Sequence, residues 1–251
     1  MKENRIRDVN RSVLTMEIKV IAAGSTKWER FIRRWGISFL IGEDVLFDTF
    51  GDPNVLMKNI RRMHIDLSKV RHIVISHDHW DHISGLWHVI GKCKNATIYI
   101  CPDFASEIKD RIRSFGVNTV EVKGWFKIKD DVFTIGQICG KCNGESISEQ
   151  SLVIKSAQGL MIITGCAHQG IDKIIDDVKK MFNEKIYLLI GGLHLKDSNQ
   201  ERIRDVISNL RACGIEKVAP MHCTGAKADK LLKTAYRDNF ISVKTGQAVE
   251  F

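Results

Sequence analysis

The chain has 251 residues, of which 44% are hydrophobic, and it carries a formal net charge of +8. This composition is that of a globular protein with a sizeable core, and no apolar stretch is long enough to form a transmembrane helix. The seven irregularly spaced cysteines argue against a secreted disulfide framework, so we expect a cytoplasmic protein. The basic residues are scattered, which argues against nucleic acid as a partner and favours a small anionic substrate.

The first residues differ in character from the rest of the chain. They are charged and contain no apolar segment, so we expect an N-terminal extension at 1–15 and not a secretory signal. Residues 16–251 contain no Gly/Ser linker and no change of composition, which predicts one domain. No coiled-coil heptad is visible, and the sequence leaves the oligomeric state open.

Short apolar runs alternate with amphipathic segments along the chain. In chain order, the first half predicts a strand at 16–23, strands at 37–42 and 44–50, a helix at 54–65, a strand at 72–76, a helix after His82, a strand at 96–101 and a helix at 103–116. The second half predicts strands at 119–123, 131–135, 152–156 and 160–164, a helix at 170–182, a strand at 185–192, a helix at 199–214, a strand at 217–223, a helix at 227–239 and a closing strand. Each half places strands before helices, which indicates packed sheets with helices outside.

Residues 72–85, HIVISHDHWDHISG, crowd metal-capable side chains behind a short apolar run. His77 and His79 are two positions apart, so at the end of an extended strand their imidazoles point the same way. Asp81 and His82 follow as the chain leaves that strand. Imidazole and carboxylate ligands suit zinc, iron and manganese, and this set can serve two divalent cations if other segments add ligands.

Metal-capable residues also follow four other apolar runs. Asp48 ends VLFD, His168 follows LMIITGCA, His194 follows YLLIGGL and His222 follows VAPM. A single histidine in such a turn is more often structural than a ligand. Their joint occurrence at strand ends is what a metal site at one edge of a sandwich requires, so the sequence predicts a metal centre.

The H-x-H-x-D-H motif, an earlier aspartate and two later histidines together resemble the metallo-β-lactamase superfamily. In this chain these residues are His77, His79, Asp81, His82, Asp48, His168 and His222. The segments FDT, SHDHWDH, TGCAH, GGLHL and HCTG resemble in particular its dihydropterin-methyl-ribofuranosylaminobenzene phosphate synthase-like branch. The resemblance implies an α/β (α+β) fold, a four-layer αββα sandwich of the metallo-β-lactamase type, and two divalent metal ions. Zinc is the first expectation for these ions, with iron, manganese or magnesium as alternatives.

By resemblance, two sets of side chains bind the two metals, and one aspartate orients a ligand from behind. These are His77, His79 and His168 for the first metal, Asp81, His82 and His222 for the second, and Asp48 behind them. Many two-metal members also carry a bridging aspartate before the last histidine, but here that strand ends in Gly191-Gly192-Leu193-His194. His194 is therefore expected in or beside the bridging position, or as a substrate contact or a general acid or base.

The resemblance implies a metal-dependent hydrolase in which metal-activated water attacks an ester, phosphoester or similar small anionic substrate, with Asp81 and His194 in catalysis. One alternative is a synthase that displaces diphosphate from a pterin-type substrate. A redox or metal-binding protein with a di-iron centre is a second alternative. Trp80 in the metal loop, and Lys27 and Arg30 in the loop after the first strand, are candidate substrate contacts.

Four cysteines lie in or near these segments. Cys139 and Cys142 form a C-x-x-C predicted in a loop, as a reversible disulfide or two inert thiols, with a redox or additional metal site as the alternative. Cys166 and Cys223 adjoin the ligand turns. We predict small buried cysteines at both positions, with a thiolate ligand or a nucleophile as the alternative.

Overall fold

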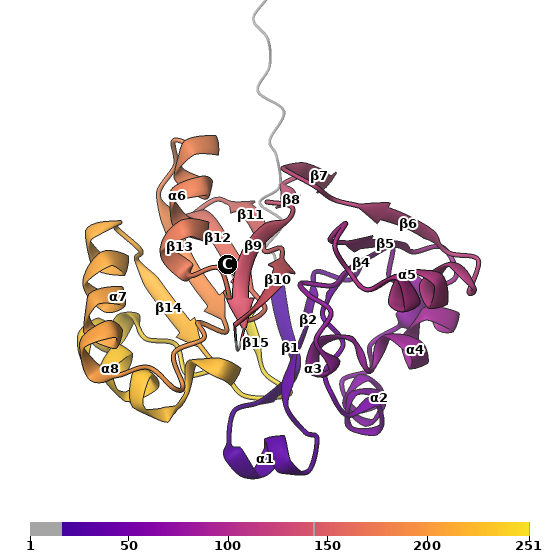
Figure 1. Cartoon of the computed structure of the whole chain (residues 1–251), viewed down its shortest axis with the longest axis horizontal. Coiled ribbons are helices and arrows are strands. Elements are labelled where there is room, and N and C mark those ends of the chain that lie inside the picture. Colours follow the sequence, from indigo (N-terminus) through magenta and orange to yellow (C-terminus); the bar gives the residue numbers. More distant parts are fainter. Residues whose placement is uncertain (1–16, 143, 251) are drawn as a thin grey trace, which may run out of the picture.

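Two β-sheets and their covering helices make up the computed structural model, which describes residues 17–142 and 144–250 (Figure 1). The predicted N-terminal extension at 1–15 lies outside the described residues. No helix in the described part of the chain is both long and apolar enough to cross a membrane.

The first sheet has seven strands and contains the first metal-ligand motif. Its strands β1 to β3 and β15 pair antiparallel, whereas β3 to β6 pair parallel. In spatial order the strands are β15 (Ala248–Glu250), β1 (Glu17–Gly24), β2 (Gly36–Ile41), β3 (Val45–Phe47), β4 (His72–Val74), β5 (Thr97–Ile100) and β6 (Asn118–Glu121).

The second sheet has six strands, of which β12, β13 and β14 are parallel and the others antiparallel. In spatial order they are β14 (Lys217–Pro220), β13 (Ile186–Gly191), β12 (Gly159–Thr164), β11 (Leu152–Ser156), β8 (Val132–Thr134) and β7 (Phe126–Lys129). A separate antiparallel hairpin consists of β9 (Ile138–Cys142) and β10 (Glu145–Glu149).

Helices cover the outer face of each sheet (Figure 1). The first sheet is covered by α2 (Pro53–Arg62), α3 (Trp80–Ile83), α4 (Leu86–Val89) and α5 (Ser106–Arg113), and the second by α6 (Ile171–Met181), α7 (Gln200–Ala212) and α8 (Ala226–Tyr236). The short α1 (Lys27–Phe31) lies in the connection from β1 to β2. Single 3₁₀ turns occur at Leu67–Lys69, Ile90–Lys92, His222–Thr224 and Arg237–Asn239.

The core lies in three apolar layers, one between the sheets and one under each set of helices. Phe39 and Phe47 of the first sheet pack with Leu152, Ile163 and Leu188 of the second, and all five are fully buried. Burying each such side chain contributes about 1.5–3 kcal/mol, so the layer between the facing sheets is a substantial source of stability. The predicted four-layer αββα sandwich is confirmed.

Helices α2 and α7 begin where the sequence supplies side-chain caps, whereas α5, α6 and α8 begin without one. The Asp52 side chain accepts hydrogen bonds from the backbone N–H groups of Asn54 and Val55, and Pro53 occupies the first turn of α2. The Asn199 side chain accepts from the N–H of Arg202 at the start of α7. These caps direct the helices back over the sheets after each strand.

Two local predictions were wrong. Cys139 and Cys142 lie in strand β9 and not in a loop, because the polar segment Glu145–Glu149 pairs with it as β10. The helix expected after His82 is divided into α3 and α4 near Gly85. A Cβ at Gly85 would lie 2.0 Å from the Thr49 carbonyl oxygen, so close packing against the β3 connection sets the path of the chain there.

Candidate metal centre

The predicted ligands follow the carboxyl ends of parallel strands from both sheets. Asp48 follows β3, His77 follows β4, His168 follows β12, His194 follows β13 and His222 follows β14. The ends of parallel strands meet at one edge of a sheet, which is where α/β proteins build sites. Contacts between rings link the segments, with centroid separations of 4.9 Å for His77 and His168 and 4.2 Å for His168 and His194.

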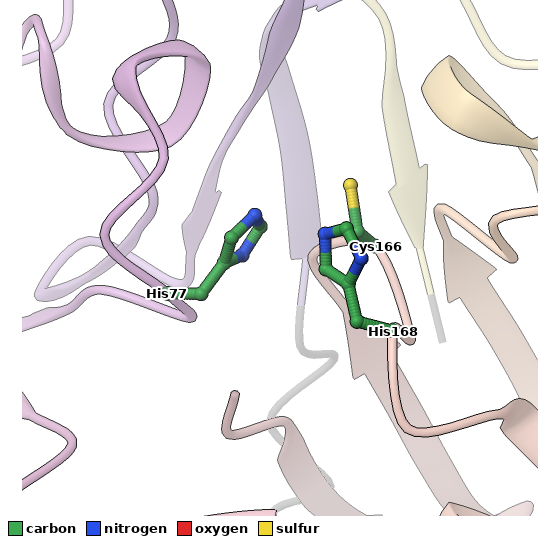
Figure 2. A group of neighbouring side chains, drawn as sticks. All are labelled: His77, Cys166 and His168. Atoms are coloured by element: carbon green, nitrogen blue, oxygen red, sulfur yellow. The ribbon is translucent and has the colours of Figure 1, made fainter. Parts of the chain in front are cut away.

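His77, His79 and His168 form the first group of side chains. His77 Nε2 lies 3.1 Å from His79 Nδ1, and the His168 ring lies 4.9 and 5.0 Å from the other two rings. Figure 2 shows His77 and His168 extending from opposite segments toward one shared space. Two nitrogens on one tetrahedral zinc are about 3.3 Å apart, so the 3.1 Å separation suits ligands of one ion.

Burial keeps these imidazoles in the form that binds metals. Burial lowers the pKa of His77 well below its ordinary value, and burial together with His194 and His79 lowers the pKa of His168 to about 2. Neither ring nitrogen of His168 has a hydrogen-bond partner among the described residues. A neutral, buried imidazole without a partner fits a metal ligand.

Asp81, His82 and His222 form the second group. The Asp81 Oδ2 atom lies 3.3 Å from His222 Nε2 and 3.6 Å from His82 Nε2. Burial would raise the pKa of Asp81, but His82 and His222 outweigh it and hold that pKa below its ordinary value. Asp81 therefore remains a carboxylate. His222 Nε2 is buried, and apart from its 3.3 Å contact with Asp81 Oδ2 it has no partner among the described residues.

Hydrogen bonds behind the rings turn the free nitrogens toward the site. His82 Nδ1 lies 2.6 Å from Asp48 Oδ2, and Asp48 also accepts from the Ser76 backbone N–H and hydroxyl at 2.7 Å each. The Ser76 hydroxyl in turn accepts from His77 Nδ1 at 2.9 Å. Such partners fix the tautomer and the orientation of a metal-binding histidine. Asp48 thus orients His82 directly and His77 through Ser76.

The second group has two buried carboxylates in or beside it, whose negative charge favours a cation. Asp48 is fully buried and Asp81 nearly so, and the ion pairs of both carboxylates within the described chain are to histidines. Burial would lower the pKa of His82, but Asp48 and Asp81 raise it to about 9. A divalent cation at His82 Nε2 would replace that proton, as metal binding to histidine generally requires.

His222 is held by the first sheet. Its Nδ1 atom lies 3.0 Å from the Gly24 carbonyl oxygen and 3.2 Å from the Gly36 backbone nitrogen. The two contacts need different tautomers, and only the one that donates to Gly24 leaves Nε2 free for a ligand role. The Trp35 ring, 6% exposed, packs 4.7 Å from the His222 ring.

Several site residues have left-handed backbone conformations although they are not glycine. The φ angles are 54° at Asp48, 59° at Ala167, 51° at His194 and 54° at His222. Such a conformation costs of order 1–3 kcal/mol and persists only where the surrounding structure enforces it. Four of these conformations occur at the strand ends that carry the site, and others occur elsewhere in the described chain, for example at His64 and Arg237.

Glu149 is a site residue that the motif-based prediction missed. It is fully buried, and its carboxylate accepts hydrogen bonds from the backbone N–H groups of Cys166, Ala167 and His168 at 2.7, 2.9 and 2.8 Å. Burial raises the pKa of Glu149, and the three N–H groups oppose that rise. Glu149 therefore holds the turn that carries His168. No motif links it to that turn.

Gly165 fits the same turn against the first sheet. A Cβ atom there would lie 2.2 Å from Ser76 Oγ and 3.1 Å from Glu149 Oε1. Since Ser76 orients His77, only glycine lets the two ligand segments approach this closely.

His194 lies beside the first group. Its ring centroid is 4.2 Å from that of His168, its backbone N–H donates to Cys223 Sγ at 3.3 Å, and its Nδ1 has no hydrogen-bond partner among the described residues. The contact with Cys223 raises the pKa of His194. His194 faces a cavity of about 230 Å³ together with His79, Asp81 and His168.

Two of the three predicted substrate contacts line this cavity. Arg30 and Trp80 line it, whereas the side chain of Lys27 lies outside what the structure describes. Trp35 and Lys196 also line it, and the prediction from sequence missed both. Arg33 stacks on Trp80, with its guanidinium carbon 4.7 Å from the ring centroid.

The C-x-x-C cysteines do not face each other as a pair. Cys139 and Cys142 are three positions apart on strand β9, which directs their side chains to opposite faces. Cys139 is exposed and lies 3.7 Å from Ser148 Oγ, whereas Cys142 lines the metal cavity near His79 and His168. All seven cysteines are free.

Comparison with known proteins bears on the family and the fold. Residues 38–136 match the family model of the metallo-beta-lactamase superfamily. The chain is 26% identical over 268 aligned positions to 7,8-dihydropterin-6-methyl-4-(beta-D-ribofuranosyl)-aminobenzene-5'-phosphate synthase of Methanocaldococcus jannaschii, covering 88% of this chain and 91% of the relative. A crystal structure of a metal-dependent hydrolase of the β-lactamase superfamily superposes with a TM-score of 0.77 at 27% identity, over 94% and 99% of the two chains. A diphosphatase of the PhnP family has the same fold, with a TM-score of 0.63 at 14% identity over 95% and 98%.

These likenesses support the metallo-β-lactamase superfamily for this chain, as its motifs predicted. Members of that superfamily generally bind divalent metals and act on small molecules. Within it, the chain is similar to the dihydropterin-methyl-ribofuranosylaminobenzene phosphate synthase, the branch that its motifs resemble.

Proposed function

We propose that this protein is a dinuclear metal-dependent hydrolase of a small anionic substrate. The observation that carries the proposal is the convergence of two groups of three ligand side chains, with unpartnered nitrogens on His168 and His222, on one cavity. Zinc is the cation that best suits the imidazole-rich set. Two divalent cations held there would polarise the scissile bond, lower the pKa of water and neutralise developing charge.

The residues of the chain have separate roles in this proposal. Asp81 and the five histidines His77, His79, His82, His168 and His222 hold the cations, and Asp48 orients the rings from behind. His194 borders the cavity with a free Nδ1, so it is placed to exchange a proton with the substrate or leaving group.

A second, larger cavity favours an anionic substrate. It measures about 860 Å³ and shares Arg30, Trp35, Lys196 and His222 with the metal cavity. Lys227 and Lys244 also line it, next to the N-terminus of α8, where helical N–H groups favour negative charge. Acidic residues lie in the same wall, but the Glu29 carboxylate is engaged by the Ser25 and Thr26 backbone N–H groups. The anionic end of a substrate would occupy this cavity while its reacting bond lies over the cations.

Loss of Lys196 tests the anionic character of the substrate. Lys196 lines both cavities, and its ammonium lies 5.4 Å from the Trp35 ring centroid. We expect Lys196→Ala to raise KM for an anionic substrate roughly tenfold with little change in kcat, because a charge contact of about 1.5 kcal/mol is lost equally from ground and transition states. Lys180→Ala, on the exposed face of α6, is the matched control. A KM within twofold of the native value would argue against this cavity as the anion site.

The synthase alternative is favoured by the sequence similarity to the Methanocaldococcus jannaschii enzyme. In that case the same cations would hold a diphosphate leaving group, and the nucleophile would be an organic acceptor rather than water. The two reactions differ in the attacking group, which is water in hydrolysis and an organic acceptor in the synthase reaction, and this difference gives a direct test.

Zinc-loaded protein should hydrolyse a nitrophenyl phosphodiester or a related ester in ¹⁸O-labelled water. Hydrolysis predicts one labelled oxygen in the product and dependence on added metal. Release of diphosphate from a pterin-type diphosphate substrate only in the presence of an organic acceptor, with no label in the products, would support the synthase instead. Neither activity in protein that binds two equivalents of metal would contradict both proposals.

A further inference from the structure

Cys166 occupies the space between the two groups of ligands. Its sulfur lies within 4.8 Å of the ligand atoms of His77 and His168, and within the same distance of those of His82 and His222. The side chain is buried, on the turn after β12. Figure 2 shows Cys166 beside His168 and across from His77. One sulfur atom is therefore close to both proposed cation positions.

The distances suit coordination by the thiol. Cys166 Sγ lies 3.4 Å from His82 Nε2, and Asp81 Oδ2 lies 3.6 Å from the same nitrogen. With Zn–S near 2.3 Å and Zn–N near 2.0–2.1 Å, a thiolate and an imidazole on one tetrahedral zinc are about 3.6 Å apart. His222 Nε2, fully buried and without a hydrogen-bond partner in the described chain, closes the same set.

Asp81 is the carboxylate that contacts the second group at this space, with its Oδ2 atom near both His82 Nε2 and His222 Nε2. Strand β13 ends in Gly191-Gly192-Leu193-His194, and His194 groups with Cys166 and Cys223 rather than with the second set of ligands. Two other buried acids are engaged elsewhere, because Glu149 accepts from backbone N–H groups and Asp48 contacts Ser76 and His82 Nδ1. A soft sulfur thus lies where a bridging group is needed.

We propose that Cys166 binds both cations as a bridging thiolate. The inference rests on the dinuclear centre proposed above. The thiol loses its proton to solvent when the cations bind, as cysteine ligands do. A thiolate ligand also selects zinc or iron over magnesium, because soft sulfur binds hard cations poorly.

Cys223 provides the matched control. Its Sγ lies 3.6 Å from the Cys166 carbonyl oxygen and groups with His194, but not with either set of metal-binding histidines. Cys93 is a second control, because it is buried under the helices of the first sheet, away from the site. A disulfide between Cys166 and Cys223 is the competing role for these thiols.

The test is the absorption spectrum of protein loaded with cobalt(II). We expect a near-ultraviolet thiolate-to-cobalt charge-transfer band in the native protein, Cys223→Ser and Cys93→Ser, and its loss in Cys166→Ser. The band should grow with both the first and the second equivalent of cobalt, since one sulfur contacts both ions.

Each other outcome overturns the proposal. Native protein that holds two equivalents of cobalt without the band has no thiolate ligand, and a band that grows with one equivalent only has a sulfur that does not bridge. Persistence of the band in Cys166→Ser assigns it to another cysteine. If titration of free thiols in the metal-free native protein finds two fewer than its seven cysteines, while Cys166→Ser and Cys223→Ser each show all their remaining cysteines as free thiols, the two residues form a disulfide instead. The spectrum of the native protein tests the proposal even if a variant does not fold. If the native protein binds no cobalt, that result contradicts the dinuclear centre itself and not only the role of Cys166.

Discussion

Asp81→Asn should remove one equivalent of metal and lower kcat/KM on the order of 10²–10³-fold, which corresponds to about 3–4 kcal/mol of transition-state stabilisation. The substitution keeps the size of the side chain but removes its negative charge. Asp81 Oδ2 contacts both His82 Nε2 and His222 Nε2, so its charge is the main attraction for a cation in the second group. Elemental analysis and steady-state kinetics on the same preparations measure both effects.

Asp78→Asn is the matched control for this experiment. Asp78 lies in the same loop, but its carboxylate accepts a hydrogen bond from the Ala105 backbone N–H and belongs to neither group of ligands. The control should retain about two equivalents of metal and nearly native activity. If Asp81→Asn also keeps both equivalents and a kcat/KM within tenfold of the native value, Asp81 does not hold a catalytic cation.

The parts of the site that lie in one continuous segment could be predicted from the sequence. His77 and His79 follow the buried strand β4, and the two-residue spacing places both imidazoles on one side. The same holds for single histidines at the ends of β12 and β14, because an apolar strand followed by a polar turn is visible without any tertiary information. The strands that are buried on both faces also gave the clearest signal for the fold.

The parts that depend on contacts between distant segments could not be predicted. Gly36 and His222 meet although they are 186 positions apart, and Trp35 packs on that histidine. A Cβ at Gly36 would lie 1.8 Å from the Asp81 carbonyl oxygen, so the start of β2 must be glycine for the second ligand group to form. Only the packed sheets reveal this requirement.

The hairpin of β9 and β10 was missed for a related reason. Its residues Glu145–Glu149 are mostly polar, and a two-stranded ribbon has little apolar pattern to detect. Yet the hairpin ends in Glu149, whose buried carboxylate accepts hydrogen bonds from the turn that carries Cys166 and His168. The function of the segment lies in that final residue rather than in its own core.

Two substitutions of Glu149, to Ala and to Gln, should show how much this residue contributes to stability and how much to metal affinity. Glu149→Ala leaves three buried backbone N–H groups, those of Cys166, Ala167 and His168, without an acceptor. Each unsatisfied donor costs about 1–3 kcal/mol, so we expect the free energy of unfolding to fall by about 3 kcal/mol or more. Glu149→Gln keeps one acceptor oxygen and should lose about half as much.

Metal affinity should follow the same order, because the turn positions His168 and Cys166. We expect weaker zinc binding in Glu149→Gln, by on the order of 10–100-fold, and a larger loss in Glu149→Ala. Urea unfolding of metal-free protein and competition with a zinc chelator measure the two quantities separately. Glu43→Gln removes an exposed carboxylate that pairs with Lys69 on the surface, and it should change stability by less than about 0.5 kcal/mol. If the metal-free Glu149→Ala protein unfolds like the native chain, the three hydrogen bonds do not hold the turn, and its shape must instead come from the packing of Gly165 against Ser76.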